Sequence, residues 1–190
     1  SFATINRNRL WHKLAKIGMS SRMLSAVRSL YQNVTSCVRL NGLFSDGFTV
    51  NTDLRQGCSL STILFNIFIN DLATSLKNLN KGVNIGSEKV CILLYADDIV
   101  IIAENENDLQ HMLSFLNEWC NLNGIFVNNS KSNIVHFRPN SFSRSDFEFK
   151  CGQSTIDYTD KYMYLGLMLH EFLDYNVTVK SVAQSASRAL

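Results

Sequence analysis

Hydrophobic residues recur three or four positions apart in five segments of the chain, the spacing that places them on one face of a helix. Gly18 ends the first pattern, and Ser20 or Ser21 can cap the second at its N-terminus. The third pattern is the longest and is clearly amphipathic. The helices predicted in this way cover residues 6–17, about 21–31, 59–79, 106–121 and 177–190.

Strands are predicted between these helices, from alternating residues and short apolar runs bounded by turn signals. "TSCVRLNGLFSDGFTV" (35–50) is expected to form two strands around its Asn-Gly and Asp-Gly turn signals. "CILLYADDIVIIA" (91–103) is expected to be a strand on each side of its two acids. Further short strands are predicted at residues 125–127, 133–137, 147–150 and 162–169.

The two acids in this last apolar run, Asp97 and Asp98, are unusual neighbours for buried strands. A buried, unpaired carboxylate costs several kcal/mol or takes up a proton, so the pair must lie at a turn, bind a cation, or do both. An ordinary hairpin turn is one interpretation, although Gly or Asn suits such a loop better than a second Asp. The run itself leaves both interpretations open.

Length and composition limit the classes of protein that fit. The chain has 190 residues, of which 46% are hydrophobic and 18% charged, as expected for one ordinary globular domain or most of one. No uninterrupted apolar run reaches about 20 residues, the length that spans a bilayer. The five cysteines are dispersed, which argues against a zinc site or disulfide framework and favours an intracellular, reducing compartment. The start lacks a Met and a signal-peptide pattern, so we expect a fragment.

Charge is distributed unevenly along the chain. Residues 1–60 contain eight Lys or Arg and two acids, a net charge of +6, whereas the chain as a whole carries only +2. A basic segment of this kind predicts a polyanionic partner such as nucleic acid, and a solvated basic helix face is the alternative.

Within the basic segment, "LRQGCSLS" places Arg55, Gln56 and Gly57 before the long helix, whose N-terminus favours anions. A simple turn and cap is the alternative there.

Five motifs, in order, resemble those of a reverse transcriptase palm, and their wording is similar to that of non-LTR (LINE-type) retrotransposons. They cover nearly the whole chain and are "SFATINRNRLWHKLAKIG", "RQGCSLSTILFNIFINDL", "YADD", "LNEWCNLNGIFVNNSKSNIVHF" and "YMYLGLMLH". The resemblance implies an α+β polymerase palm, an antiparallel sheet with helices on one face, over residues 1–170. It also implies part of the fingers, including a hairpin at about 35–50, and the first thumb helix at 171–190.

The resemblance also implies RNA-directed DNA polymerisation with two Mg²⁺ ions, which Mn²⁺ can replace. Asp97 and Asp98 would be metal ligands, because Mg²⁺ prefers hard carboxylate, water and phosphate oxygens. The family's other metal-binding Asp would lie just ahead of Ser1, so this chain alone is expected to be inactive. Ala3 replaces a second family Asp. The implied partners are an RNA template, a DNA primer and dNTPs, with no membrane, in the cytoplasm and nucleus.

Further roles are implied for residues that match the family's motifs. Phe2, Arg55, Gln56, Gly57 and Tyr95 would contact the nucleotide, the template or the primer end, and Lys131 would neutralise or protonate pyrophosphate. Tyr164, Leu165 and Gly166 would brace the primer strand. The alternatives are that Phe2 and Tyr95 are ordinary core aromatics and that Lys131 is simply a solvated lysine. For Tyr164, Leu165 and Gly166, the alternative is a buried pair of strands. A truncated or decayed palm that at most binds nucleic acid is the alternative function.

Overall fold

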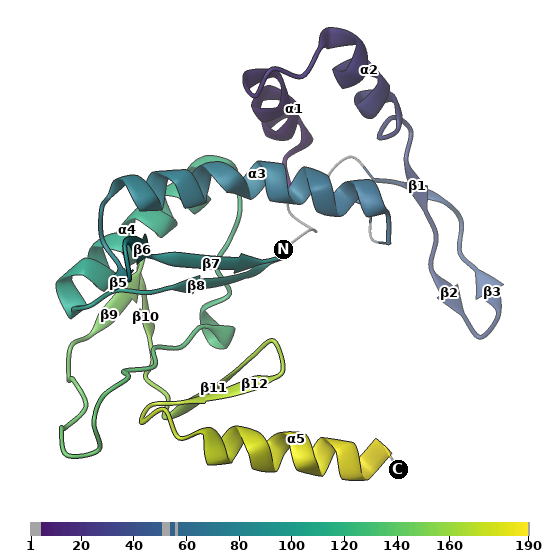
Figure 1. Cartoon of the computed structure of the whole chain (residues 1–190). Coiled ribbons are helices and arrows are strands. Elements are labelled where there is room, and N and C mark those ends of the chain that lie inside the picture. Colours follow the sequence, from purple (N-terminus) through teal and green to yellow (C-terminus); the bar gives the residue numbers. More distant parts are fainter. Residues whose placement is uncertain (1–4, 51–53, 56, 190) are drawn as a thin grey trace. The chain divides into compact units, whose positions relative to one another are not determined.

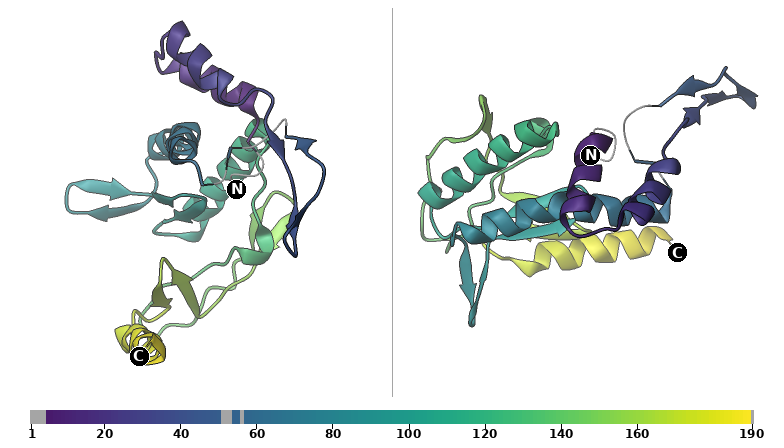
Figure 2. Two further views of the ribbon diagram at one scale, coloured as in Figure 1. Left: turned by 90° about the vertical axis from the view of Figure 1, so that its right-hand side faces the viewer. Right: turned by 90° about the horizontal axis from the view of Figure 1, so that it is seen from above.

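The computed structural model of the chain describes residues 5–50, 54–55 and 57–189. It divides into two compact units, Ser1–Phe126 and Val127–Leu190, which are described separately (Figures 1 and 2). The sequence-based domain boundary at residue 170 stays a prediction. Phe2, Ala3 and Gln56 lie outside the described residues.

Four helices and three β-hairpins build the described part of the first unit. Three of these helices begin after a residue whose side chain accepts backbone N–H groups, namely Asn6, Ser20 and Asn105, and Gly124 adopts a left-handed φ of 70° at the C-terminus of one of them. The four predicted helices of this unit are therefore confirmed to within about two residues. They are α1 (Arg7–Lys16), α2 (Ser21–Ser29), α3 (Ser59–Asn78) and α4 (Glu106–Asn123).

The core of this unit lies where α1, α3 and α4 meet. Leu10, Phe68 and Met112, one from each helix, are fully buried. Lys13 enters the same core with its Nζ 4.1 Å from the centre of the Phe68 ring, and donates a 2.7 Å hydrogen bond to the Phe68 carbonyl. Burial lowers the pKa of Lys13, while its ion pair with Asp71 opposes that shift.

Helix α3 is long and apolar enough, by length and composition, to cross a membrane. Counting uninterrupted apolar residues misses this, because Asn66, Asn70 and Asp71 interrupt the pattern. The core helix of a globular protein meets the same two conditions. Seven of the 20 residues of α3 are buried, and 39% of its apolar window lies inside the structure.

The strands of the first unit form separate two-stranded antiparallel sheets. β1 (Thr35–Ser36) pairs with β4 (Phe48–Thr49), and β2 (Arg39–Leu40) pairs with β3 (Leu43–Phe44) around the predicted Asn41-Gly42 turn. The Asp46-Gly47 signal makes no hairpin turn and lies in the returning arm. β5 (Val83–Ile85) and β6 (Glu88–Val90) form a hairpin that projects from the helices (Figure 2), and β7 (Ile92–Tyr95) pairs with β8 (Asp98–Ile101).

The second unit contains two more hairpins and a helix. β9 (Phe149–Cys151) pairs with β10 (Ser154–Ile156), and β11 (Lys161–Tyr164) pairs with β12 (Leu167–His170), which contacts α5 (Tyr175–Ala189). An α+β fold is therefore confirmed, but the described strands are paired in twos where one antiparallel sheet was expected.

Several predicted strands are wrong, because strand pairing is not visible in the local sequence. Residues 125–127 form no strand, since the Ile125 amide instead bonds to the Cys120 carbonyl at the end of α4. Of residues 133–137, only Ile134 pairs, in an isolated bridge with Tyr158. Residues 162–169 form two paired strands, in agreement with the resemblance of "YMYLGLMLH" to a hairpin, whereas the β5–β6 hairpin and β10 were not predicted.

Candidate functional site

The two acids lie at the tip of the β7–β8 hairpin, which packs against α3 (Figure 1). Tyr95 and Asp98 are paired, so the loop consists of Ala96 and Asp97. Ala96 has a φ of 50°, a left-handed conformation that costs a residue with a Cβ about 1 kcal/mol. The predicted hairpin is confirmed, with Asp97 in the turn and Asp98 as the first residue of a strand.

Neither carboxylate is buried, which resolves the conflict between two acids and an apolar run. Cys91 and Ile92, at the far end of the hairpin, are 1% and 8% exposed, whereas Asp97 and Asp98 are both exposed. Among the residues that the structure describes, neither carboxylate has a hydrogen-bond or ion-pair partner. Two free, adjacent carboxylates suit a hard divalent cation that takes its other ligands from water and phosphate.

The carboxylate pair is not part of a larger ligand cluster. Within the described ranges, no group of three or more His, Cys, Asp or Glu side chains is placed to hold a metal ion. The residues present therefore fit a cation held by two protein carboxylates, and they equally fit the turn-only interpretation. Tyr95 is 61% exposed, so the alternative of a core strand aromatic is wrong for this residue.

The start of α3 is a second polar feature of the first unit. Gly57 has a φ of 79° with open space around its Cα, so the turn itself requires glycine here. Arg55 is exposed, and its guanidinium lies 5.8 Å from the Tyr31 ring. Backbone amides of Ser61 and Leu60 lower the pKa of the Cys58 thiol, as the positive end of a helix should. Both the anion-binding and the turn-and-cap interpretations fit these facts.

The remaining predicted site residues belong to the second unit. Lys131 ends a short 3₁₀ helix (Asn129–Lys131) and is exposed, and its carbonyl accepts a 3.2 Å hydrogen bond from the Tyr162 hydroxyl. Leu165 and Gly166 form the tip of the β11–β12 hairpin, with φ values of 49° and 82°. Leu165 is 52% exposed, so the alternative of a buried strand pair is wrong at this tip.

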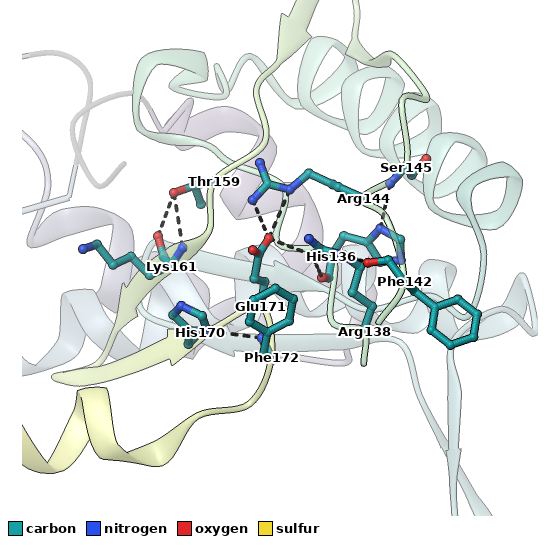
Figure 3. A network of polar contacts seen from close by, with 10 residues as sticks. All are labelled: His136, Arg138, Phe142, Arg144, Ser145, Thr159, Lys161, His170, Glu171 and Phe172. Atoms are coloured by element: carbon teal, nitrogen blue, oxygen red, sulfur yellow. Dashed lines mark hydrogen bonds and ion pairs between the residues drawn. The ribbon is translucent and has the colours of Figure 1, made fainter. Parts of the chain in front are cut away.

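A cluster of charged residues in the second unit was missed by the sequence analysis. Arg138 and Arg144 both donate hydrogen bonds to the carboxylate of Glu171 (Figure 3). The Arg138 hydrogen bond, followed by that of Arg144, lowers the pKa of Glu171 to about 2. The two arginines precede their partner by 33 and 27 residues, so no local sequence signal could have revealed the cluster.

Comparison with protein families decides the relationship. The model that describes the reverse transcriptase (RNA-dependent DNA polymerase) family matches residues 1–169. The chain belongs to the reverse transcriptase family. The predicted resemblance is thereby confirmed for most of the length of this reverse transcriptase chain.

Relatives from mobile elements agree with this assignment. The RNA-directed DNA polymerase from mobile element jockey of Drosophila funebris is 26% identical, over 94% of this chain and 20% of the relative. A Pol polyprotein from the type-1 retrotransposable element R2 of Popillia japonica is 25% identical, over 70% of this chain and 19% of the relative. The R2DM polyprotein of Drosophila melanogaster is 24% identical, over 88% and 16%. This reverse transcriptase chain thus spans about a fifth of the length of these relatives.

Proposed function

We propose that the chain is the polymerase palm, with part of the fingers and the start of the thumb, of a non-LTR retrotransposon protein that copies RNA into DNA. The family match over residues 1–169 supports this proposal. The observation that carries it is the β7–β8 hairpin, which presents two unpartnered carboxylates at an exposed tip. Its strands fix the positions of the carboxylates and its turn exposes them, as a metal-dependent site requires.

Asp97 and Asp98 are the residues that would hold the Mg²⁺ ions. When bound, the metal stabilises negative charge on the attacking 3′-oxygen and on the leaving pyrophosphate. The two side chains supply hard oxygen ligands, and the described strands hold both carboxylates at the tip of one hairpin. Mn²⁺ would be accepted at the same place, since it also prefers oxygen ligands.

The other site residues would bind the substrates. Arg55 would pair with a phosphate, Tyr95 would pack beside the primer end, and Lys131 would neutralise pyrophosphate, all three being exposed. Phe2, Gln56 and Gly57 would shape the nucleotide and template pocket, and the hairpin tip Tyr164, Leu165 and Gly166 would brace the primer. The partners would be an RNA template, a DNA primer and dNTPs, encountered inside the cell, in cytoplasm and nucleus.

Primer extension tests this function directly. The protein encoded by the whole gene should extend a DNA primer on an RNA template in Mg²⁺, and Asp97→Asn should lower the rate at least about 100-fold, since each tenfold is ~1.4 kcal/mol of barrier. Asp157→Asn, an exposed acid in the second unit, is the matched control and should retain activity.

The same assay separates the enzyme from a nucleic-acid-binding remnant. A folded protein that binds a primer–template duplex but never extends the primer would support the remnant. Extension that survives Asp97→Asn would contradict the assignment of the catalytic carboxylates.

A further inference from the structure

Glu171, which directly follows β12, is a buried carboxylate that none of the roles above uses. Its side chain is 8% exposed, and those of Arg138 and Arg144 are 10% and 33% exposed. One carboxylate oxygen, Oε2, accepts a 2.7 Å hydrogen bond from Arg138 Nη1 and a 3.1 Å hydrogen bond from Arg144 Nε. Arg144 Nη2 donates to the same oxygen, so Arg144 binds with two nitrogens of its planar fork (Figure 3).

The backbone of Glu171 links the base of the β11–β12 hairpin to the segment that contains Arg138. Its amide donates a 2.8 Å hydrogen bond to the Asp160 carbonyl, which extends the β11–β12 pairing by one step beyond Lys161. Its carbonyl accepts a 2.9 Å hydrogen bond from the Arg138 amide. Side chain and main chain of this residue therefore tie the base of the hairpin to the segment that carries both arginines.

The segment from 136 to 145 is itself held in place. Arg138 Nε donates a 3.0 Å hydrogen bond to the Phe142 carbonyl, and the Ser145 amide donates a 3.1 Å hydrogen bond to His136 Nδ1. The Arg138 guanidinium also lies 4.8 Å from the centre of the Phe172 ring. Hydrogen bonds within this segment therefore hold both arginines in position to bind Glu171.

The β11–β12 hairpin depends on such support for its direction. In the described part of the chain it pairs with no third strand, and an isolated two-stranded hairpin is only marginally stable. Thr178 of α5 holds one strand through a 2.5 Å hydrogen bond to the Met168 carbonyl. Its four-residue strands place the tip ~13 Å from the base, so a rotation of about 10° at the base moves the tip by roughly 2 Å.

We propose that Arg138, Arg144 and Glu171 form a clamp that orients the β11–β12 hairpin, which makes Glu171 a positioning residue for the primer strand. The inference rests on the proposed function, because that function assigns the hairpin tip to the primer. Glu171 touches no substrate in this scheme. It acts through the hairpin, so its loss should weaken primer binding and leave dNTP binding intact.

The test compares Glu171→Gln, Glu171→Asp and a matched control, Glu148→Gln, in the protein encoded by the whole gene. Glu148 also pairs with a cation, Lys150, at 3.2 Å, but it is 62% exposed and is therefore not a clamp. Glu171→Gln keeps the shape of the side chain and leaves two arginine charges without their carboxylate. It should raise the KM for primer–template about tenfold and change the KM for dNTP less than about twofold.

Hydrogen exchange supplies a readout that does not depend on activity. In Glu171→Gln, the amides of β11 and β12 should exchange at least about tenfold faster, while those of α3 and α4 keep their protection. Glu171→Asp, which retains the charge, should recover part of both effects, and Glu148→Gln should show neither. If Glu171→Gln fails to fold, Arg144→Lys, which loses the fork but keeps its charge, should show a smaller change in the same direction.

Two results would overturn the clamp. One is faster exchange of the hairpin with an unchanged primer–template KM, which would make the cluster purely structural. The other is unchanged exchange in folded Glu171→Gln. If the unaltered protein fails to extend any primer, the proposed function fails by itself. The clamp is then judged by exchange together with the dissociation constant for a primer–template duplex.

Discussion

Two exposed, unpartnered carboxylates at the tip of one hairpin suit a divalent cation, because such ions prefer hard oxygen ligands. Asp97 and Asp98 are in this situation, since within the described ranges neither has a positive or hydrogen-bonding partner. Ala96 holds a left-handed conformation in the same loop, a local strain that residues near functional sites often carry. At the scale of single residues, a bound cation and a simple turn both fit the pair, and metal binding distinguishes them.

The residue-scale prediction concerns the metal itself. Mn²⁺ should bind the chain weakly, because in the described ranges no third ligand side chain joins the two carboxylates and water must supply the other ligands. Asp97→Asn should lower the affinity for Mn²⁺ at least about fivefold, and the double variant with Asp98→Asn should abolish the binding. Water proton relaxation measures the amount of Mn²⁺ bound. Asp157→Asn should bind Mn²⁺ normally. Equal binding by the double variant would leave the turn-only interpretation.

At the scale of elements, helices and hairpins differ in how far the sequence predicts them. The helix starts at Asn6, Ser20 and Asn105 depend on neighbours within three residues, so pattern and capping predict the helices well. The β7–β8 hairpin was predictable, since its acids could not be buried between apolar strands. The β5–β6 hairpin was not, because its strands are only three residues long and largely exposed, so the alternation Val83-Asn84-Ile85 is too short to mark a strand.

Gly82, which precedes β5, gives the element-scale prediction. Its φ is 128°, and an added Cβ would lie 2.5 Å from the Val90 carbonyl oxygen and 2.9 Å from Cys91 Cα. Because these atoms belong to the backbone that leads into β7, Gly82→Ala should lower the free energy of unfolding by roughly 2–4 kcal/mol. Denaturant titration measures this loss.

Gly86 provides the matched control for that substitution. It also has a positive φ, 61°, but nothing lies within 4 Å of an added Cβ, so Gly86→Ala should cost only about 1 kcal/mol. Equal losses for the two variants would show that backbone conformation, and not the close approach at Gly82, determines the effect.

At the scale of the whole molecule, the sequence does not predict contacts between residues that are far apart in the chain. The clamp joins residues up to 33 positions apart, and nothing in the local sequence of Arg138 or Glu171 sets them apart from surface charges. Charge asymmetry, by contrast, is readable from composition alone, but composition does not say which cations are free. The structure shows that Arg7 donates 3.1 Å hydrogen bonds to two carbonyls and that Lys13 is held in the core.

Six of the eight basic residues in segment 1–60 remain exposed, which bounds the electrostatic part of nucleic-acid binding: Arg9, Lys16, Arg22, Arg28, Arg39 and Arg55. Each phosphate neutralised contributes ~0.9 to the salt slope of log affinity on B-DNA, so these six cations should contribute a slope no steeper than about −5.4 on an RNA–DNA duplex. Fluorescence anisotropy between low and high salt measures this slope. Replacing Arg22 and Arg28 by Gln should make it shallower by up to ~2, while Lys180→Gln, an exposed cation in α5, should leave it unchanged. Because counterion release requires cations that face solvent, an affinity independent of salt would show that this basic segment does not contact the phosphates.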